Sequence, residues 1–527
     1  MKKRIYINDW LQFKPYKKHL SSDTYYLQMC NDIYKIFLKA DYENALKQVL
    51  IDNEIKELSC FITSYFEDII SETSIWSTFI MLNERKIGKI LPYYDTENYT
   101  KGETNIQDVK FLIWYFINSV GEGRAISPTS QLFKVLSLEI MKILDDEWQY
   151  APENEYLSNF YQVDGNFEEY YDARIFIDNL LFKTWLFFPD SRKKLEKNEQ
   201  RIVKEYADYN QIEYFLNEMR DELVIDSHTK LHNLKGKEWT AEILGYEHPE
   251  YEHYLNISKR VSGFFLYKNQ DEKYIYLEHI ATGKKLNLFK QSIDYPHLFN
   301  KEEEIIFISM VKWKNEWWFS GIFFTQKYDS KIIEQEKQSL QSKIALDFLD
   351  KNDDEKIKVT KKQHKSFKAY NDGYEIAFMP VNEINDFIKN FIKFYNNALK
   401  TKLRKSRNSM FDDDEEVFDA SDIDENETGL VYFDPKNGIQ ISYGICDAFP
   451  MKNNPYCNIL KSEEDIKYML FSDDISPELV LYCIKHCADD LPYFKTAEGQ
   501  TYLKDLDFTL SFFKNEGHDD RNQMTFV

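Results

Sequence analysis

The sequence predicts an α+β protein: a mostly helical chain with a small five-stranded β-barrel at its centre and a β-hairpin in its C-terminal part. Two observations lead to this prediction. The 527 residues include only 16 glycines and 13 prolines, which favours long helices over many tight turns. From Val261 onward, the helical spacing of apolar residues changes to short runs rich in β-branched and aromatic residues.

Residues 1–257 are predicted to form a helical domain. In the stretch TYYLQMCNDIYKIFLKA, apolar residues recur every three or four positions and so fall on one side of a helix: Leu27, Cys30, Ile33, Tyr34, Ile36 and Phe37. Further stretches such as DVKFLIWYFINSV and SQLFKVLSLEIMKILDDEW repeat this spacing without a fixed repeat length. A helical bundle is therefore expected rather than a regular solenoid.

Residues 258–327 are predicted to form the barrel. The segments VSGFFLYK, KYIYLEHI, KKLNLF, EIIFISMVKW and EWWFSGIFF are separated by turn-forming residues, as in barrels of the OB or SH3-like type. Alternation places Trp317 and Phe319 on one face of the last strand and Trp318 on the other. Trp313, Trp317 and Phe319 are expected to pack, whereas Trp318 is a candidate for a ligand or interdomain contact.

Residues 328–527 are predicted to form a C-terminal α+β region. The stretch 351–368 is charged and nearly free of large apolar residues, so we interpret it as a linker or exposed loop. Further on, the basic patch Lys400–Arg407 precedes an acidic loop, 411–427, which holds ten carboxylates within sixteen positions. Such a block repels itself and is typically disordered.

Two later features mark a hairpin and a helix in the same region. Asn437-Gly438 lies between the alternating runs LVYFD and IQISY, which is a strong hairpin signal. Ser476-Pro477 has the residues of a helix N-cap and first turn.

The net charge of −22 disfavours binding to nucleic acids or to anionic membranes, because both surfaces are negatively charged. The lysines near the start are not followed by the apolar segment of a signal peptide, and the longest apolar run, FLIWYFINSV, is about half of the ~20 residues that span a bilayer. Six cysteines without a regular framework agree with a reducing compartment. We therefore expect a cytoplasmic protein with no membrane contact, no cofactor and a protein as its partner.

Motifs for nucleotide binding and common hydrolases are absent: there is no GxxxxGK, GxGxxG, HExxH or GxSxG. His228 and His232 are four residues apart, a spacing that would place both on one helix face and could hold a metal. Because no third and fourth ligand is evident at a recognisable spacing, surface histidines are the preferred interpretation.

Cys483, His486 and Cys487 fall within one helical turn and form a second candidate metal site. Cysteines four apart on an apolar helix face are more often core residues. Cys446 follows a strand in GICDA and loosely resembles a nucleophile elbow, with His486 as the candidate base. The residues after it do not open a helix, which departs from the strand–turn–helix context of such elbows.

The barrel is the best candidate binding module. OB folds bind single-stranded nucleic acid through aromatic platforms in a positive groove. Here nine lysines against eight acidic residues between Val261 and Lys327 leave a net charge of only +1. Interior or interdomain packing of the aromatic residues is therefore preferred over a ligand-binding or nucleic-acid-binding face.

The N-terminal segment IYINDWLQFKPYKKHLSSDTYYL resembles the start of a family of bacterial proteins with a domain of unknown function and an (I/F)-x-I-x-D-W-L-x-x-K-P-Y opening. The matching residues are Ile7, Asp9, Trp10, Leu11, Lys14, Pro15, Tyr16, Asp23, Tyr25, Tyr26 and Leu27. The central segment is similar to a small bacterial β-barrel module. Neither resemblance implies a catalytic residue.

Taken together, these patterns favour a binding or scaffold protein without catalysis of its own. One alternative is an enzyme that uses Cys446 and His486 or a metal. The other is a nucleic-acid-associated factor that uses the barrel and the Lys400–Arg407 patch.

Overall fold

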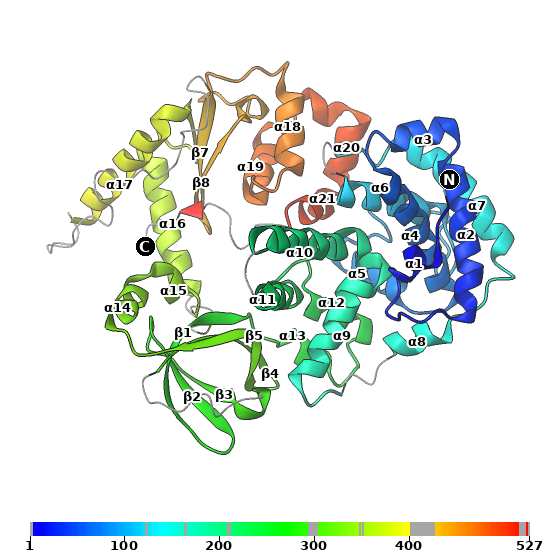
Figure 1. Cartoon of the computed structure of the whole chain (residues 1–527). Coiled ribbons are helices and arrows are strands. Elements are labelled where there is room, and N and C mark those ends of the chain that lie inside the picture. The colour runs from blue at the N-terminus through cyan, green and yellow to red at the C-terminus, as the bar shows by residue number, and fades with distance from the viewer. Residues whose placement is uncertain are drawn as a thin grey trace. The chain divides into compact units, whose positions relative to one another are not determined.

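The computed structural model describes residues 4–121, 125–162, 166–207, 212–293, 304–346, 349, 353–400, 427–515 and 523–524. The chain divides into two compact units, Met1–Leu349 and Asp350–Val527. The first contains a helical region and a β-barrel, and the second contains a small sheet with helices (Figure 1). The predicted α+β class with a central barrel and a C-terminal hairpin is confirmed.

The helical region of the first unit begins with a short helix and continues through longer ones. Their bounds are α1 (Ile7–Leu11), α2 (Ser21–Phe37), α3 (Ala40–Leu46), α4 (Asp52–Ile70), α5 (Ile75–Ile87), α6 (Ile106–Val120), α7 (Gln131–Glu147), α8 (Glu155–Tyr161), α9 (Tyr170–Lys183), α10 (Lys193–Glu205), α11 (Ile212–Ile225), α12 (Gly236–Leu244) and α13 (Tyr251–Leu255). Two tighter turns, η1 (Trp185–Phe187) and η2 (Phe188–Arg192), connect α9 to α10.

Helices α4 and α6 form the centre of this region. Both are buried on almost every side, which is the pattern of a helix surrounded by other helices. Aromatic rings fill the space between them: the ring centroid of Phe61 lies 5.4 Å from that of Phe116 and 5.2 Å from that of Trp185. The apolar run FLIWYFINSV thus forms a core helix, and none of the described helices is both long and apolar enough to cross a membrane.

The five predicted strands close into a barrel with the order β1-β2-β3-β5-β4. Their bounds are β1 (Val261–Gln270), β2 (Tyr274–His279), β3 (Lys285–Phe289), β4 (Ile305–Trp313) and β5 (Glu316–Gln326). The barrel is mixed, because β3 pairs with β5 in parallel whereas the other pairs are antiparallel. Phe265, Leu288, Ile308 and Met310 lie in its buried interior.

The hairpin between β4 and β5 turns at Lys314 and Asn315, which both have positive φ values, of 44° and 69°. Such a turn matches the right-handed twist of the two strands. Trp317 and Phe319 pack on the interior of the barrel, whereas Trp313 and Trp318 belong to a core shared with the helices. Helices α14 (Ser330–Gln338) and α15 (Leu340–Ile344) follow the barrel.

The second unit is built on an antiparallel sheet of order β6-β7-β8-β9. Its elements are α16 (Asp353–Tyr370), β6 (Ile376–Pro380), η6 (Val381–Glu383), α17 (Ile384–Lys400), β7 (Thr428–Asp434), β8 (Gly438–Tyr443), η7 (Cys446–Ala448), α18 (Ser462–Phe471), α19 (Pro477–Cys487), η8 (Pro492–Lys495), α20 (Ala497–Lys504), α21 (Leu506–Phe513) and β9 (Gln523–Met524). Phe367 of α16 and Phe391 of α17 pack against Phe433 of β7, so these helices cover one face of the sheet.

Two features of this unit confirm local sequence signals. The β7–β8 hairpin pairs Asp434 with Gly438, which has a φ of 96°. Helix α19 begins at Pro477, and the Ser476 hydroxyl accepts a hydrogen bond of 3.2 Å from the Leu479 amide. Asn-Gly and Ser-Pro thus mark the ends of these elements as expected.

The expectation of a linker or loop at 351–368 was wrong for most of that stretch, because α16 begins at Asp353. The buried side of this helix consists of Thr360, Gln363 and Phe367, which recur at helical spacing but include only one large apolar residue. Apolar periodicity therefore does not reveal this helix. Most of the acidic loop 411–427, and the basic patch beyond Lys400, lie outside the described residues.

Candidate functional site

The residues of the N-terminal motif converge on a buried carboxylate. Asp23, in the first turn of α2, is fully buried. It accepts hydrogen bonds of 2.8 Å from the Trp10 indole, 2.8 Å from the Tyr16 hydroxyl and 2.6 Å from the Leu20 amide. Buried carboxylates persist in proteins when donors surround them in this way. The motif thus anchors the N-terminal segment to the start of α2.

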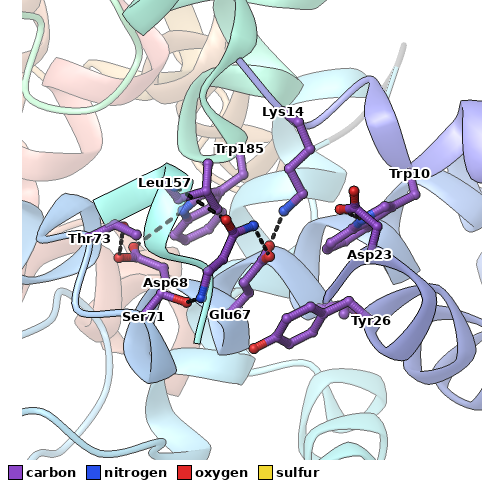
Figure 2. Close-up of polar contacts among 12 residues, drawn as sticks. Trp10, Lys14, Asp23, Tyr26, Glu67, Asp68, Ser71, Thr73, Leu157 and Trp185 are labelled. Atoms are coloured by element: carbon purple, nitrogen blue, oxygen red, sulfur yellow. Dashed lines mark hydrogen bonds and ion pairs between the residues drawn. The ribbon is translucent and has the colours of Figure 1, made fainter. Parts of the chain in front are cut away.

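A buried ion pair lies beside this carboxylate (Figure 2). The Lys14 ammonium contacts the carboxylate of Glu67 on α4, and it lies 3.7 Å from the ring centroid of Trp10. The Asn154 amide nitrogen donates to Glu67 at 2.8 Å and to the Tyr16 hydroxyl at 2.9 Å. Since Tyr16 also donates to Asp23, one hydrogen-bond network joins both buried carboxylates.

Burial sets the protonation of this network. It raises the pKa of Glu67, and the Lys14 ammonium opposes that shift. Burial and the nearby carboxylates raise the pKa of Tyr16 far above its usual value, so this residue remains a neutral phenol. The contact with the Lys14 ammonium therefore offsets part of the cost of burying the Glu67 carboxylate.

Asp68, the residue after Glu67, forms a second polar centre. It accepts hydrogen bonds from the Thr73 hydroxyl, from the Trp76 amide at 2.8 Å and from the Trp185 indole at 3.2 Å. Burial nevertheless raises the pKa of Asp68 to about 6. Figure 2 shows that Glu67 points toward Lys14, whereas Asp68 points toward Trp185. Two consecutive residues of α4 thus bind the N-terminal segment and η1.

This network is closed to solvent. Lys14, Asp23, Glu67 and Asp68 are each at most 4% exposed. A substrate would have to displace core helices to reach them. The arrangement is suited to holding α1, α2, α4 and the start of α8 in a fixed geometry.

An open cleft lies in the second unit, next to strand β6. Its volume is about 720 Å³, and it is bordered by the end of α16, by β6 and by the first turns of α17. Helix α16 ends at Tyr370 because Asp372 and Gly373 adopt positive φ values, of 49° and 92°, that redirect the chain into β6. We call this hollow the β6 cleft.

The β6 cleft combines aromatic rings with carboxylates. Tyr370, Tyr374, Phe378 and Phe387 supply the rings, and Asp372, Glu383 and Asp386 supply the carboxylates. These three acidic residues are exposed, and no lysine, arginine or histidine is among the described residues that line the cleft. The cleft therefore combines a net negative charge with aromatic side chains in its lining.

Comparison with known proteins identifies the first unit more closely. Residues 4–289 match the family described as "Protein of unknown function (DUF3843)", a match that covers more than half of the chain. The chain belongs to this family. The match confirms the resemblance of the N-terminal motif, and it includes the helical region and the first three barrel strands of this DUF3843 protein. No curated protein and no solved structure matches.

His228 and His232 of the DUF3843 protein do not share a helix face. His228 pairs with Lys235 in an isolated β-bridge, and His232 lies in a turn with a φ of 60°. Burial lowers the pKa of His232 to about 3, which keeps the ring neutral. Across the described part of the chain, no group of three or more His, Cys, Asp or Glu residues is arranged to hold a metal ion.

Cys446, Cys483 and Cys487 are all buried in the second unit. Burial raises the pKa of Cys446 to about 12, which disfavours its thiolate. The Thr428 side chain hydrogen-bonds the Cys446 thiol, and the Asn454 side-chain amide donates to the backbone carbonyl of Cys446 at 2.8 Å. The His486 ring lies against Tyr482, with centroids 4.5 Å apart. The pairing of Cys446 with His486 stays a prediction.

Trp318 is 5% exposed and lies on the outer side of the barrel. Its ring centroid is 5.9 Å from that of Tyr171 on α9 and 4.9 Å from that of Phe289 on β3. Trp318 therefore contacts the helical region. A role in ligand binding stays a prediction.

The N-terminal motif marks the family in the sequence, but the sequence alone does not reveal the buried hydrogen bonds and ion pair that its residues form. Lys14, Trp10 and Tyr16 could be identified as a group, whereas their partners Glu67 and Asn154 are distant in sequence. The β6 cleft was also missed, because it forms only when the ends of two helices meet one strand. The turn residues after Tyr370 were the available signal for it.

Proposed function

We propose that this DUF3843 protein is a non-catalytic binding or scaffold protein and that its ligand occupies the β6 cleft. The observation that supports this proposal is the cleft of about 720 Å³ itself, which lies within the range of about 300–1,000 Å³ for ligand sites. Its mixture of aromatic rings, carboxylates and amides is typical of sites that fix the orientation of a ligand.

The first unit supports the scaffold part of the proposal. Its charged groups Lys14 and Glu67 are paired in the interior, where they hold helices rather than meet solvent. We further propose a cytoplasmic location. The six free cysteines agree with a reducing compartment.

Ligand-observed NMR with small neutral aromatic fragments, indole and benzamide among them, tests this function on the full chain. Asn390, an exposed residue of α17, lines the cleft, so Asn390→Trp should fill it. Lys485→Trp places the same ring on the exposed side of α19 and is the matched control. We expect fragments to bind the parent and the control, and to bind Asn390→Trp about tenfold more weakly, a loss of ~1.4 kcal/mol. Absence of binding, or equal binding by all three proteins, would refute the proposal.

One observation favours nucleic-acid binding by the barrel as a second candidate function. Phe264, Phe307 and Phe324 are aligned across β1, β4 and β5, and the rings of Phe307 and Phe324 stack with centroids 5.0 Å apart. Phe324 is 46% exposed, so bases could stack there. Fluorescence anisotropy with labelled oligo-dT should then show salt-dependent binding that Phe324→Ala weakens, whereas no binding at low salt would eliminate this candidate.

A further inference from the structure

Strand β6 is at the edge of its sheet, and the direction of its backbone groups follows from the hydrogen bonds at its two ends. The sheet order β6-β7-β8-β9 leaves one side of β6 without a partner strand among the described elements. The Phe433 amide donates to the Glu375 carbonyl at 2.9 Å, and the Val381 amide donates to the Glu427 carbonyl at 3.0 Å. Odd-numbered residues of β6 therefore bond to β7.

The same alternation directs the backbone of the even-numbered residues toward the open edge. The Ile376 carbonyl there accepts hydrogen bonds from the side-chain amides of Asn371, at 3.0 Å, and Asn453, at 2.9 Å. Pro380, at the far end, has no N–H to offer. Phe378 lies between them, and its N–H and C=O are a donor and an acceptor on that edge.

Phe378 also lines the β6 cleft, so the open edge and the cleft form one surface. The edge offers backbone hydrogen bonds, and the cleft offers aromatic rings with the carboxylates of Asp372, Glu383 and Asp386. Backbone bonds of this kind are made by an extended peptide that adds a strand. Carboxylates beside aromatic rings attract ammonium and guanidinium groups.

We propose that the β6 cleft binds an extended, lysine- or arginine-rich segment of a partner protein, which pairs with β6 at Phe378 and places its cations against Glu383 and Asp386. This inference rests on the proposed function, because it assigns the ligand class of the same cleft. The capped Ile376 carbonyl and Pro380 confine the pairing to one residue pair at the centre of the strand, which keeps β6 from pairing indiscriminately.

The test uses fluorescence anisotropy on the full chain with a labelled, acetylated and amidated peptide that alternates lysine with valine. We expect binding that becomes about tenfold weaker when the lysines are replaced by glutamine, or when the valine amides are N-methylated to remove edge hydrogen bonds. Spermidine supplies the cations without a peptide backbone, and we expect it to bind at least about tenfold more weakly than the peptide.

Protein variants and hydrogen exchange locate the binding. The double variant Glu383→Gln/Asp386→Asn should weaken peptide binding about tenfold. The control is Asp489→Asn, which removes an exposed carboxylate that lies on neither β6 nor α17 and should leave peptide binding unchanged. The Phe378 amide should exchange rapidly in the free protein and become protected when the peptide is added. Unchanged exchange of the Phe378 amide, or equal peptide binding by both variants, would overturn the inference.

If neutral fragments occupy the cleft and the peptide does not, only this inference fails. If neither binds, the proposed function fails with it.

Discussion

Lys14 and Glu67 form a buried ion pair between residues that lie 53 positions apart in sequence. Removing one partner of such a pair leaves an unpaired buried charge, which typically costs about 3–5 kcal/mol. We therefore expect Lys14→Met to lower the free energy of unfolding of the first unit by about that amount in urea denaturation. The double variant Lys14→Met/Glu67→Leu should recover most of the loss, because it removes both charges.

The surface pair of Lys35 and Asp32 provides the control. Its side chains are 74% and 37% exposed, and such pairs contribute about 0–1 kcal/mol. Lys35→Met should thus leave the urea midpoint nearly unchanged. A similar small effect for Lys14→Met would show that the buried pair is not the anchor of the N-terminal segment.

The buried carboxyl of Asp108 should make stability depend on pH. It accepts hydrogen bonds from Tyr65 and Tyr99, but burial raises its pKa from 3.8 to about 7. A carboxyl whose pKa is higher in the folded state stabilises the fold below its unfolded pKa, and this contribution is lost as pH rises through about 7. Every tenfold difference between the folded and unfolded ionisation constants corresponds to about 1.4 kcal/mol of stability.

Urea denaturation at pH 5 and pH 8 tests this effect through Asp108→Asn. The asparagine side chain at position 108 cannot ionise, whereas the parent loses stability as Asp108 ionises. The free energy of unfolding of the variant, measured relative to that of the parent, should therefore be higher at pH 8 than at pH 5. Asp32→Asn, at an exposed site, should show no such change. A constant difference between Asp108→Asn and the parent would contradict a raised pKa at Asp108.

Truncation of Trp318 should separate packing from ligand contact. Because this ring is buried against Tyr171 and Phe289, we expect Trp318→Ala to cost about 3–5 kcal/mol of unfolding free energy. The exposed Tyr328 is the control, since Tyr328→Ala should change stability by no more than about 0.5 kcal/mol. A near-neutral Trp318→Ala would instead indicate a side chain kept for binding.

Alkylation distinguishes a buried thiol from an activated nucleophile at Cys446. Its pKa of about 12 predicts slow reaction with iodoacetamide at pH 8 in the folded protein and rapid reaction in urea, measured by mass spectrometry of tryptic peptides. Cys457, the less buried thiol, should react first under native conditions. Preferential labelling of native Cys446 would support the enzyme alternative.

Apolar spacing and capping residues predicted many of the helices and strands, because these features act within a few residues along the chain. The alternation in β1 places Phe265 inside the barrel, and Ser476-Pro477 begins α19. The failures have equally local causes. The four-residue spacing of His228 and His232 suggested a helix, but the intervening chain turns, with His232 at positive φ. Helix α16 uses Thr360 and Gln363 on its buried side, so apolar periodicity did not reveal it.

The sequence by itself determined most of the elements, the five-stranded barrel and the N-terminal motif that resembles the family. Only the tertiary structure decided what that motif does, because Lys14 and Tyr16 acquire Glu67 and Asn154 as partners when α4 and the start of α8 pack beside them. The same holds for Phe378, whose backbone direction depends on the register of β6 with β7. Periodicity describes which face of an element is buried, whereas hydrogen-bond partners between distant segments depend on how those faces meet.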